Sequence, residues 1–98
     1  MTIFKRIFSL DSIEATRIAE SVISELRSRS YEELVKLSVD SERNAIRGSD
    51  GIVYNVVAFG IAEPEGVLRV AAAVDNGGLS SLKPLVREFL MQPDGSIM

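Results

Sequence analysis

Residues 42–75, ERNAIRGSDGIVYNVVAFGIAEPEGVLRVAAAVD, decide the fold of this chain. Three runs rich in apolar and β-branched residues are separated by SDG at positions 49–51 and by EPEG at positions 63–66. Runs of this composition, bounded by Gly, Pro and Asp, are typical of β-strands joined by tight turns. The stretch therefore predicts a three-stranded antiparallel meander.

The faces of this meander follow from the lengths assigned to its turns. If Pro64-Glu65 is a two-residue loop, Phe59 lies opposite Val70 on a core face that also carries Val57 and Ile61. The same register gives a second face of mostly small side chains: Tyr54, Val56, Ala58, Gly60, Ala62, Val67, Arg69, Ala71, Ala73 and Asp75.

The first turn sets the position of the first strand in the same way. If Ser49-Asp50 is also a two-residue turn, Ile46 meets Val53 on the core face, and Asn44 faces Asn55 there as a structural amide pair. Arg43 and Arg47 then join the second face, which we call the predicted small-residue face.

Helices are expected before the meander. Apolar residues recur at helical spacing from Ala15 to Leu26, and Asp11 followed by Glu14 is a capping-box variant, which together predict a helix over 12–28. Ser30 followed by Glu33 is a second capping box. It predicts a short helix carrying Leu34, Val35 and Leu37, with the break near Arg29.

A third helix is expected after the meander. Ser80, Ser81 and Pro84 suit its first turn, and the helix would continue to about Leu90. The tail at 92–96, QPDGS, is predicted to form a turn, after which Ile97 and Met98 either pair back or fray.

The predicted fold class is α+β, with element order α-α-β-β-β-α: two N-terminal helices, a three-stranded antiparallel β-meander, and a C-terminal helix packed on the sheet. Residues 1–98 are expected to form a single domain, because 98 residues suffice for one hydrophobic core. In element order alone the chain resembles a shortened cystatin-like or nuclear-transport-factor-like cone fold. This resemblance implies a scaffold that hosts binding pockets and enzyme sites alike.

Composition limits the available chemistry. The chain has no Cys, His or Trp, which removes disulfides, thiolate catalysis, Cys-based zinc sites and the commonest general base. No metal and no cofactor is predicted, and a non-enzymatic role is favoured. The eleven basic and fourteen acidic residues are scattered, with a net charge of −3, which argues against nucleic-acid binding. No signal peptide or membrane span is recognised, so a cytoplasmic location is expected.

The predicted small-residue face is the main candidate site, because the solvated face of a sheet normally carries Thr, Lys and Glu. Three alternatives remain for what covers this face: the chain's own helices or N-terminal arm, a second copy in a homodimer, or a small ligand. For an interface with a second copy or another protein partner, the candidates are Ala58, Gly60, Ala71, Ala73, Phe4 and Phe8. For a pocket holding a carboxylate or phosphate, they are Arg43, Arg47 and Arg69 with the Tyr54 hydroxyl.

Self-association or protein-partner binding is the leading functional hypothesis, and a ligand-binding or enzymatic pocket over the same face is the alternative.

Two other segments have structural explanations. Residues 75–81, DNGGLSS, could bind an anion but read as a glycine turn before a Ser N-cap. Ile3, Phe4, Ile7 and Phe8 form an apolar stripe, with a strand as the rival pattern, and are expected to pack on their own domain or across a dimer.

Overall fold

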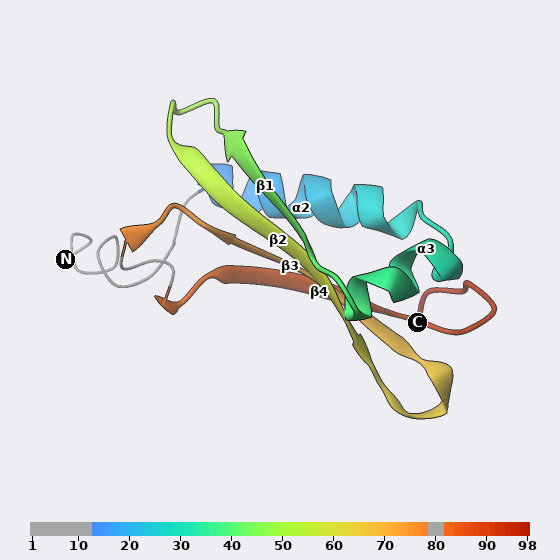
Figure 1. Cartoon of the computed structure of the whole chain (residues 1–98). Helices are drawn as coiled ribbons and strands as arrows, with labels where there is room; N and C mark the ends of the chain where they lie inside the picture. Colours follow the sequence, from blue (N-terminus) through green and yellow to red (C-terminus); the bar gives the residue numbers. More distant parts are fainter. Residues whose placement is uncertain (1–12, 79–81) are drawn as a thin grey trace.

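The computed structural model describes residues 13–78 and 82–98, which form two α-helices and a four-stranded sheet (Figure 1). The helical elements are α2 (Ile13–Arg27), α3 (Tyr31–Val35) and the 3₁₀ turns η1 (Lys36–Ser38) and η2 (Pro64–Gly66). The strands are β1 (Glu42–Arg47), β2 (Val53–Ala62), β3 (Leu68–Asp75) and β4 (Leu85–Met91). All pairings are antiparallel, in the order β1-β2-β3-β4. The predicted order α-α-β-β-β-α is therefore wrong.

The C-terminal helix expected through Leu90 is strand β4, which pairs with β3 along its whole length. Its side chains alternate between the two faces of the sheet, and Phe89 and Met91 are buried. Alternation over seven residues is a strand signal. Pro84 stands just before the strand, where its missing N–H removes no ladder hydrogen bond. Long-range pairing with β3 thus outweighs the helix-start signal.

The N-terminal helices match their predictions closely. The break after α2 falls near Arg29, and Ser30 caps α3. Glu33 N donates to Ser30 Oγ at 3.2 Å, and Ser30 N donates to Glu33 Oε1 at 3.2 Å. This capping box satisfies donors that a helix start leaves unpaired. The predicted caps Asp11, Ser80 and Ser81 lie outside the described residues.

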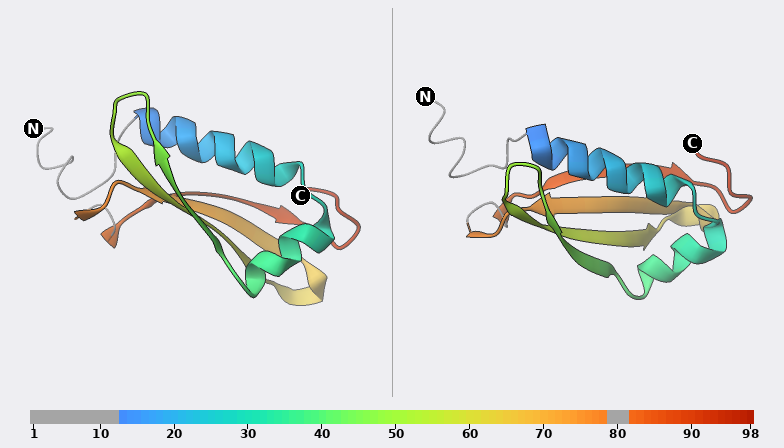
Figure 2. Two further views of the ribbon diagram at one scale, coloured as in Figure 1. Left: turned by 45° about the horizontal axis from the view of Figure 1, so that its top comes forward. Right: turned by 90° about the horizontal axis from the view of Figure 1, so that it is seen from above.

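α2 and α3 lie on one face of the sheet, which we call the inner face (Figure 2). α2 packs mainly over β3 and β4, and Leu34 and Leu37 extend the core over β2 and β3. The inner-face residues of the two central strands are buried: Tyr54, Val56, Ala58, Leu68, Val70, Ala72 and Val74. We call the opposite surface the outer face.

Both hairpin turns contain three loop residues rather than two. Gly48 N donates to the Ile52 carbonyl at 2.7 Å, and Glu63 N donates to the Val67 carbonyl at 2.8 Å. Each loop ends in a glycine with positive φ, 83° at Gly51 and 80° at Gly66. A three-residue hairpin loop favours glycine at this position because its backbone is left-handed there.

The longer loops shift both registers by one residue. Phe59 lies opposite Ala71, not Val70, and Ile46 lies opposite Tyr54, not Val53. A one-residue shift moves side chains to the other face relative to their partners. The predicted faces are therefore wrong for β2, whose Val57, Phe59 and Ile61 do not lie in the core, whereas Val70 of β3 is in the core as predicted.

The C-terminal tail pairs back onto β4, which is one of the two outcomes predicted for Ile97 and Met98. Gln92 N donates to the Ser96 carbonyl at 2.8 Å, which closes the predicted turn. Ile97 forms a bridge with Met91, and Met98 N donates to the Leu90 carbonyl at 2.9 Å. Part of the free edge of β4 is thereby paired.

Candidate functional site

The site residues proposed from the sequence do not share one face. Three lie on the inner face: Tyr54, Ala58 and Gly60. Five lie on the outer face: Arg43, Arg47, Arg69, Ala71 and Ala73. Phe4 and Phe8 lie outside the described residues. The predicted small-residue face is therefore not a continuous surface.

The inner-face candidates belong to the core. Tyr54 is buried, and its hydroxyl donates to Asp50 Oδ2 at 2.7 Å. Ala58 packs in the cluster that contains Leu26 and Leu34. A Cβ on Gly60 would lie 3.2 Å from the backbone nitrogen of Ser38, because η1 crosses directly over the strand. The small side chains allow the chain's own helices to approach the sheet closely.

The outer face also carries apolar side chains. They come from β2 (Val53, Val57, Phe59, Ile61), β3 (Ala71, Ala73) and β4 (Val86, Leu90). Val53, Ile61 and Val86 keep 43%, 46% and 44% of their surface accessible. Ala71 keeps only 2%, because the longer side chains of Phe59 and Glu88 flank it in the ladder. Val57, Phe59, Ala71, Ala73 and Val86 are neighbours in the ladder, whereas Asn55 separates Val53 from them. An exposed apolar patch of this kind is typical of an interaction site.

Charged groups lie within this apolar surface as well as beside it, since Arg69 stands between Ile61 and Leu90, and Glu88 lies opposite Ala71. Arg69 Nε donates to Glu63 Oε2 at 2.7 Å, and Arg69 Nη1 donates to Glu88 Oε2 at 2.8 Å. These hydrogen bonds, the one to Glu63 first, raise the pKa of Arg69 above its usual value. Arg69 is thus held in place by its own domain, which weakens its predicted role as an anion ligand.

The charges of the outer face also balance. Arg43 and Arg47 lie on β1 at one side of the sheet, and Arg69 lies on β3. Three carboxylates, Glu63, Asp75 and Glu88, lie toward β3, β4 and the end of β2. The face therefore has no net charge, and its basic groups are concentrated at the β1 side.

A cleft of about 190 Å³ lies between α2 and β1, and we call it the α2–β1 cleft. Its apolar walls include Val22, Leu26, Ile46, Val56 and Ala58. Its polar lining is Ser21, Glu25, Arg29, Glu42 and Asn44. The cleft exists because α2 lies over the opposite half of the sheet and leaves the inner side of β1 partly exposed.

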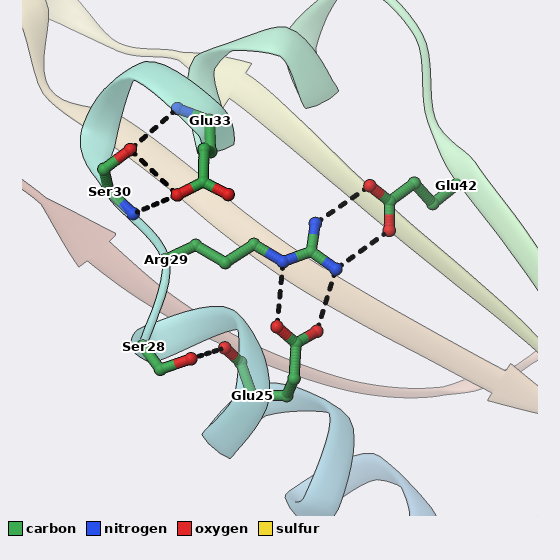
Figure 3. A network of polar contacts seen from close by, with 6 residues as sticks. All are labelled: Glu25, Ser28, Arg29, Ser30, Glu33 and Glu42. Carbon is green, nitrogen blue, oxygen red and sulfur yellow. Dashed lines mark hydrogen bonds and ion pairs between the residues drawn. The ribbon is translucent and has the colours of Figure 1, made fainter.

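Arg29 closes one end of this cleft by joining two carboxylates (Figure 3). Its Nε and Nη2 donate to Glu25 at 2.9 and 2.8 Å, and its Nη1 and Nη2 donate to Glu42 at 2.8 and 3.1 Å. The hydrogen bonds to Glu25 and Glu42 raise the pKa of Arg29, and the bond from Arg29 lowers the pKa of Glu42. Because four of its five N–H groups are used, this guanidinium ties the α2–α3 junction to β1 rather than holding an anion.

Glu14 makes a second tie between α2 and the sheet. The carboxylate accepts hydrogen bonds from Arg17 Nη2 at 2.6 Å and from Ser49 N at 2.6 Å. These bonds, the one from Arg17 first, lower the pKa of Glu14 to about 2. The first turn of α2 is thereby linked to the β1–β2 turn.

Sequence reasoning missed the polar end of the cleft. The spacing of Glu25 and Arg29 is a helical i,i+4 pair and was a usable signal. The partner Glu42 lies on β1, and only the folded arrangement brings it to Arg29. Asn44 and Asn55, expected to face each other, lie on opposite faces, since Asn44 is opposite Val56 and lines the cleft.

Comparison with known proteins identifies no relative: no family model matches the chain, and neither curated proteins nor solved structures give a match. None of the described helices is long and apolar enough to cross a membrane. Within residues 13–78 and 82–98, no group of three or more Asp and Glu side chains is arranged to hold a metal ion. The functional conclusion therefore rests on the two surfaces described above.

Proposed function

We propose that this domain is a protein-binding module that self-associates through the outer face of its sheet. The observation that carries the proposal is the apolar surface across β2, β3 and β4, on the face opposite the helices (Figure 2). Burial of apolar surface stabilises an association by roughly 25 cal/mol per Å² before ordering costs are subtracted. Two such faces can pack as the layers of a β-sandwich do.

The distribution of charge favours a second copy of the chain as the partner. The whole chain carries a net charge of −3, but the outer face is neutral, so bringing two of these faces together does not concentrate like charge. A two-fold axis parallel to the strands would place β1 of one copy over β4 of the other. The basic side formed by Arg43 and Arg47 would then approach the side that carries Glu88.

The alternative of a ligand-binding or enzymatic pocket has less support. The α2–β1 cleft encloses about 190 Å³, whereas small-molecule pockets usually have roughly 300–1,000 Å³. Its one guanidinium, on Arg29, is already engaged by two carboxylates. A protein surface is therefore the better-supported site.

Sedimentation velocity across a concentration series tests the proposal. Wild-type chain should shift from monomer to dimer as concentration rises, and Val86→Arg should move this transition to higher concentration, because Val86 lies on the outer face and is 44% exposed. Val39→Arg is the matched control, since Val39 is 91% exposed but lies outside the sheet. A wild-type chain that stays monomeric throughout, or equal effects of the two variants, would overturn the proposal. Ala58→Arg is unsuitable because Ala58 is in the core.

A further inference from the structure

The outer edge of β1 is open in the described part of the chain. β1 lies at one side of the sheet, with β2 as its paired neighbour. At the other side, the tail residues Ile97 and Met98 pair with β4. Within residues 13–78 and 82–98, no segment pairs with the free edge of β1. An edge of this kind presents backbone donors and acceptors to an added strand.

The hairpin bond shows which backbone groups of β1 are free. Gly48 N donates to the Ile52 carbonyl, so residues of the same parity, including Asn44 and Ile46, direct their backbone groups toward β2. Arg43, Ala45 and Arg47 direct theirs toward the open edge. An added strand would therefore form its hydrogen bonds with these three residues.

The α2–β1 cleft adjoins this edge on the inner face. Side chains of an added strand alternate between faces, so every second one would lie beside Asn44 and Ile46 at the cleft. Ile46 is only partly buried, and the walls behind it are apolar. The Asn44 amide makes no hydrogen bond with other described residues and is exposed. This side of the edge therefore suits a strand with apolar side chains that also offers a backbone or side-chain group able to hydrogen-bond to the Asn44 amide.

The outer side of the same edge is basic. Arg43 and Arg47 both lie there, separated by Ala45, and Arg43 makes no ion pair with another described residue. Pairing of β1 with a second copy of itself would bring four arginines onto one face at neighbouring positions, which is unfavourable. A strand with acidic residues at those positions would instead be attracted.

We propose that the open edge of β1 binds an extended, acidic segment of a partner protein by strand addition. The segment alternates apolar residues, directed toward the α2–β1 cleft, with acidic residues directed toward Arg43 and Arg47. Backbone hydrogen bonds to the edge supply affinity, and the alternating side chains supply specificity. The edge adjoins the outer-face interface and shares Arg43 and Arg47 with it. Its backbone hydrogen bonds do not involve Val86, however, so Ala45→Pro and Val86→Arg distinguish the failure of one proposal from the failure of the other.

The probe is a capped synthetic peptide of alternating valine and glutamate with the length of β1, six residues, compared with a valine–lysine peptide. Binding is measured by fluorescence anisotropy at low salt. The glutamate peptide should bind at least about tenfold more tightly, since two attractive contacts are replaced by two repulsive ones. The double variant Arg43→Glu/Arg47→Glu should reverse this order.

Ala45→Pro separates strand addition from simple charge attraction. Proline at this position removes an N–H that points to the open edge and leaves the bonds to β2 intact, as edge strands tolerate. The variant should retain its far-UV circular dichroism and lose binding of the glutamate peptide, whereas Val86→Arg should keep it. If Ala45→Pro unfolds the domain, amide chemical shifts of the wild type serve instead: the largest changes should fall on Arg43, Ala45 and Arg47.

Four outcomes would overturn the proposal. They are no binding of either peptide, equal binding of both, unchanged binding to folded Ala45→Pro, and amide shifts concentrated on the outer face away from β1. If the chain forms a dimer that is dissociated by Ala45→Pro but not by Val86→Arg, the edge of β1 binds a second copy of the chain. This result would also refute the outer-face dimer.

Discussion

Removing the guanidinium of Arg29 should destabilise the domain by about 1–2 kcal/mol. In the structure Arg29 makes four hydrogen bonds, two to Glu25 and two to Glu42 (Figure 3). Arg29→Met keeps an unbranched apolar side chain and deletes these bonds. It also leaves two carboxylates close together at the end of the α2–β1 cleft without a cation between them.

The magnitude follows from the exposure of the three side chains. Arg29 is 23% exposed, but Glu25 and Glu42 are 55% and 46% exposed, so solvent screens both pairs. Exposed ion pairs contribute about 0.2–1 kcal/mol each, which gives roughly 0.4–2 kcal/mol for two. Repulsion between the remaining carboxylates adds to the loss, so the upper part of this range is expected. For a domain of this size the melting temperature should fall by roughly 5–15 °C.

Urea unfolding followed by far-UV circular dichroism measures the effect, in a double-mutant cycle with Glu42→Gln. Glu42→Gln should destabilise the wild type, but it should be neutral or stabilising beside Arg29→Met, because it then removes a repulsion. Both effects should shrink in high salt. Arg43→Met, on the exposed edge, should change stability by less than about 0.5 kcal/mol. An unchanged stability of Arg29→Met, or equal effects of Glu42→Gln in both backgrounds, would refute this reasoning.

Two further predictions concern the turns and the response to acid. Gly51→Ala and Gly66→Ala should each lower the free energy of unfolding by about 1–2 kcal/mol, as measured by thermal unfolding, because the backbone is left-handed at both positions. Gly66→Ala should lower it more, since its Cβ would lie 2.9 Å from Pro93 Cγ, whereas no atom lies within 4 Å of a Cβ at Gly51. Equal losses would contradict the packing of the tail. The folded pKa of Glu14, about 2, lies below its ordinary value of 4.5, so its contribution is complete above pH 4.5 and is lost as the pH falls toward 2. Glu14→Gln should therefore flatten the stability–pH curve in that interval more than the exposed control Glu32→Gln does. If the two variants give the same curve, Glu14 does not stabilise the domain in the way described.

The helices were predictable because their signals are local. The capping box of Ser30 and Glu33 and the apolar spacing of α2 each lie within a few consecutive turns of chain, and both appear in the structure. Strand β4 was not predictable in the same way. Leu85 and Phe89 are four residues apart, which fits a helix, while the full segment alternates, which fits a strand. Pairing with β3 decides between them, and that contact depends on the whole sheet.

The lengths of the hairpin turns were the second feature that could not be predicted from the sequence. The sequence prediction takes Ser49-Asp50 as a two-residue turn, whereas Ser49-Asp50-Gly51 forms a three-residue turn ending in a left-handed glycine. Local composition allows both, but only the longer turn pairs Ile46 with Tyr54, so that both side chains join the core cluster beneath α2. The register is therefore chosen by burial at a distance from the turn. The Arg29–Glu42 contact likewise depends on the whole fold, since Arg29, just after α2, and Glu42, at the start of β1, meet only in the folded domain.

The corrected register shows that side-chain size alone does not indicate which face of this sheet is buried. In the sequence prediction, the strand face rich in Ala and Gly is covered by the chain's own helices or N-terminal arm, by a second copy or by a ligand. The face of Val57, Phe59 and Ile61 is the predicted core. In the structure Ala58 and Gly60 are small because helical segments lie directly against them, as the 3.2 Å approach at Gly60 requires. Phe59 and Ile61 then fall on the face that the described helices leave open. Close helix packing explains Ala58 and Gly60, while Tyr54, Leu68 and Val70 fill other parts of the covered face. The apolar residues left on the outer face mark the surface available for association, so a search for the partner should begin there and at the adjacent edge of β1.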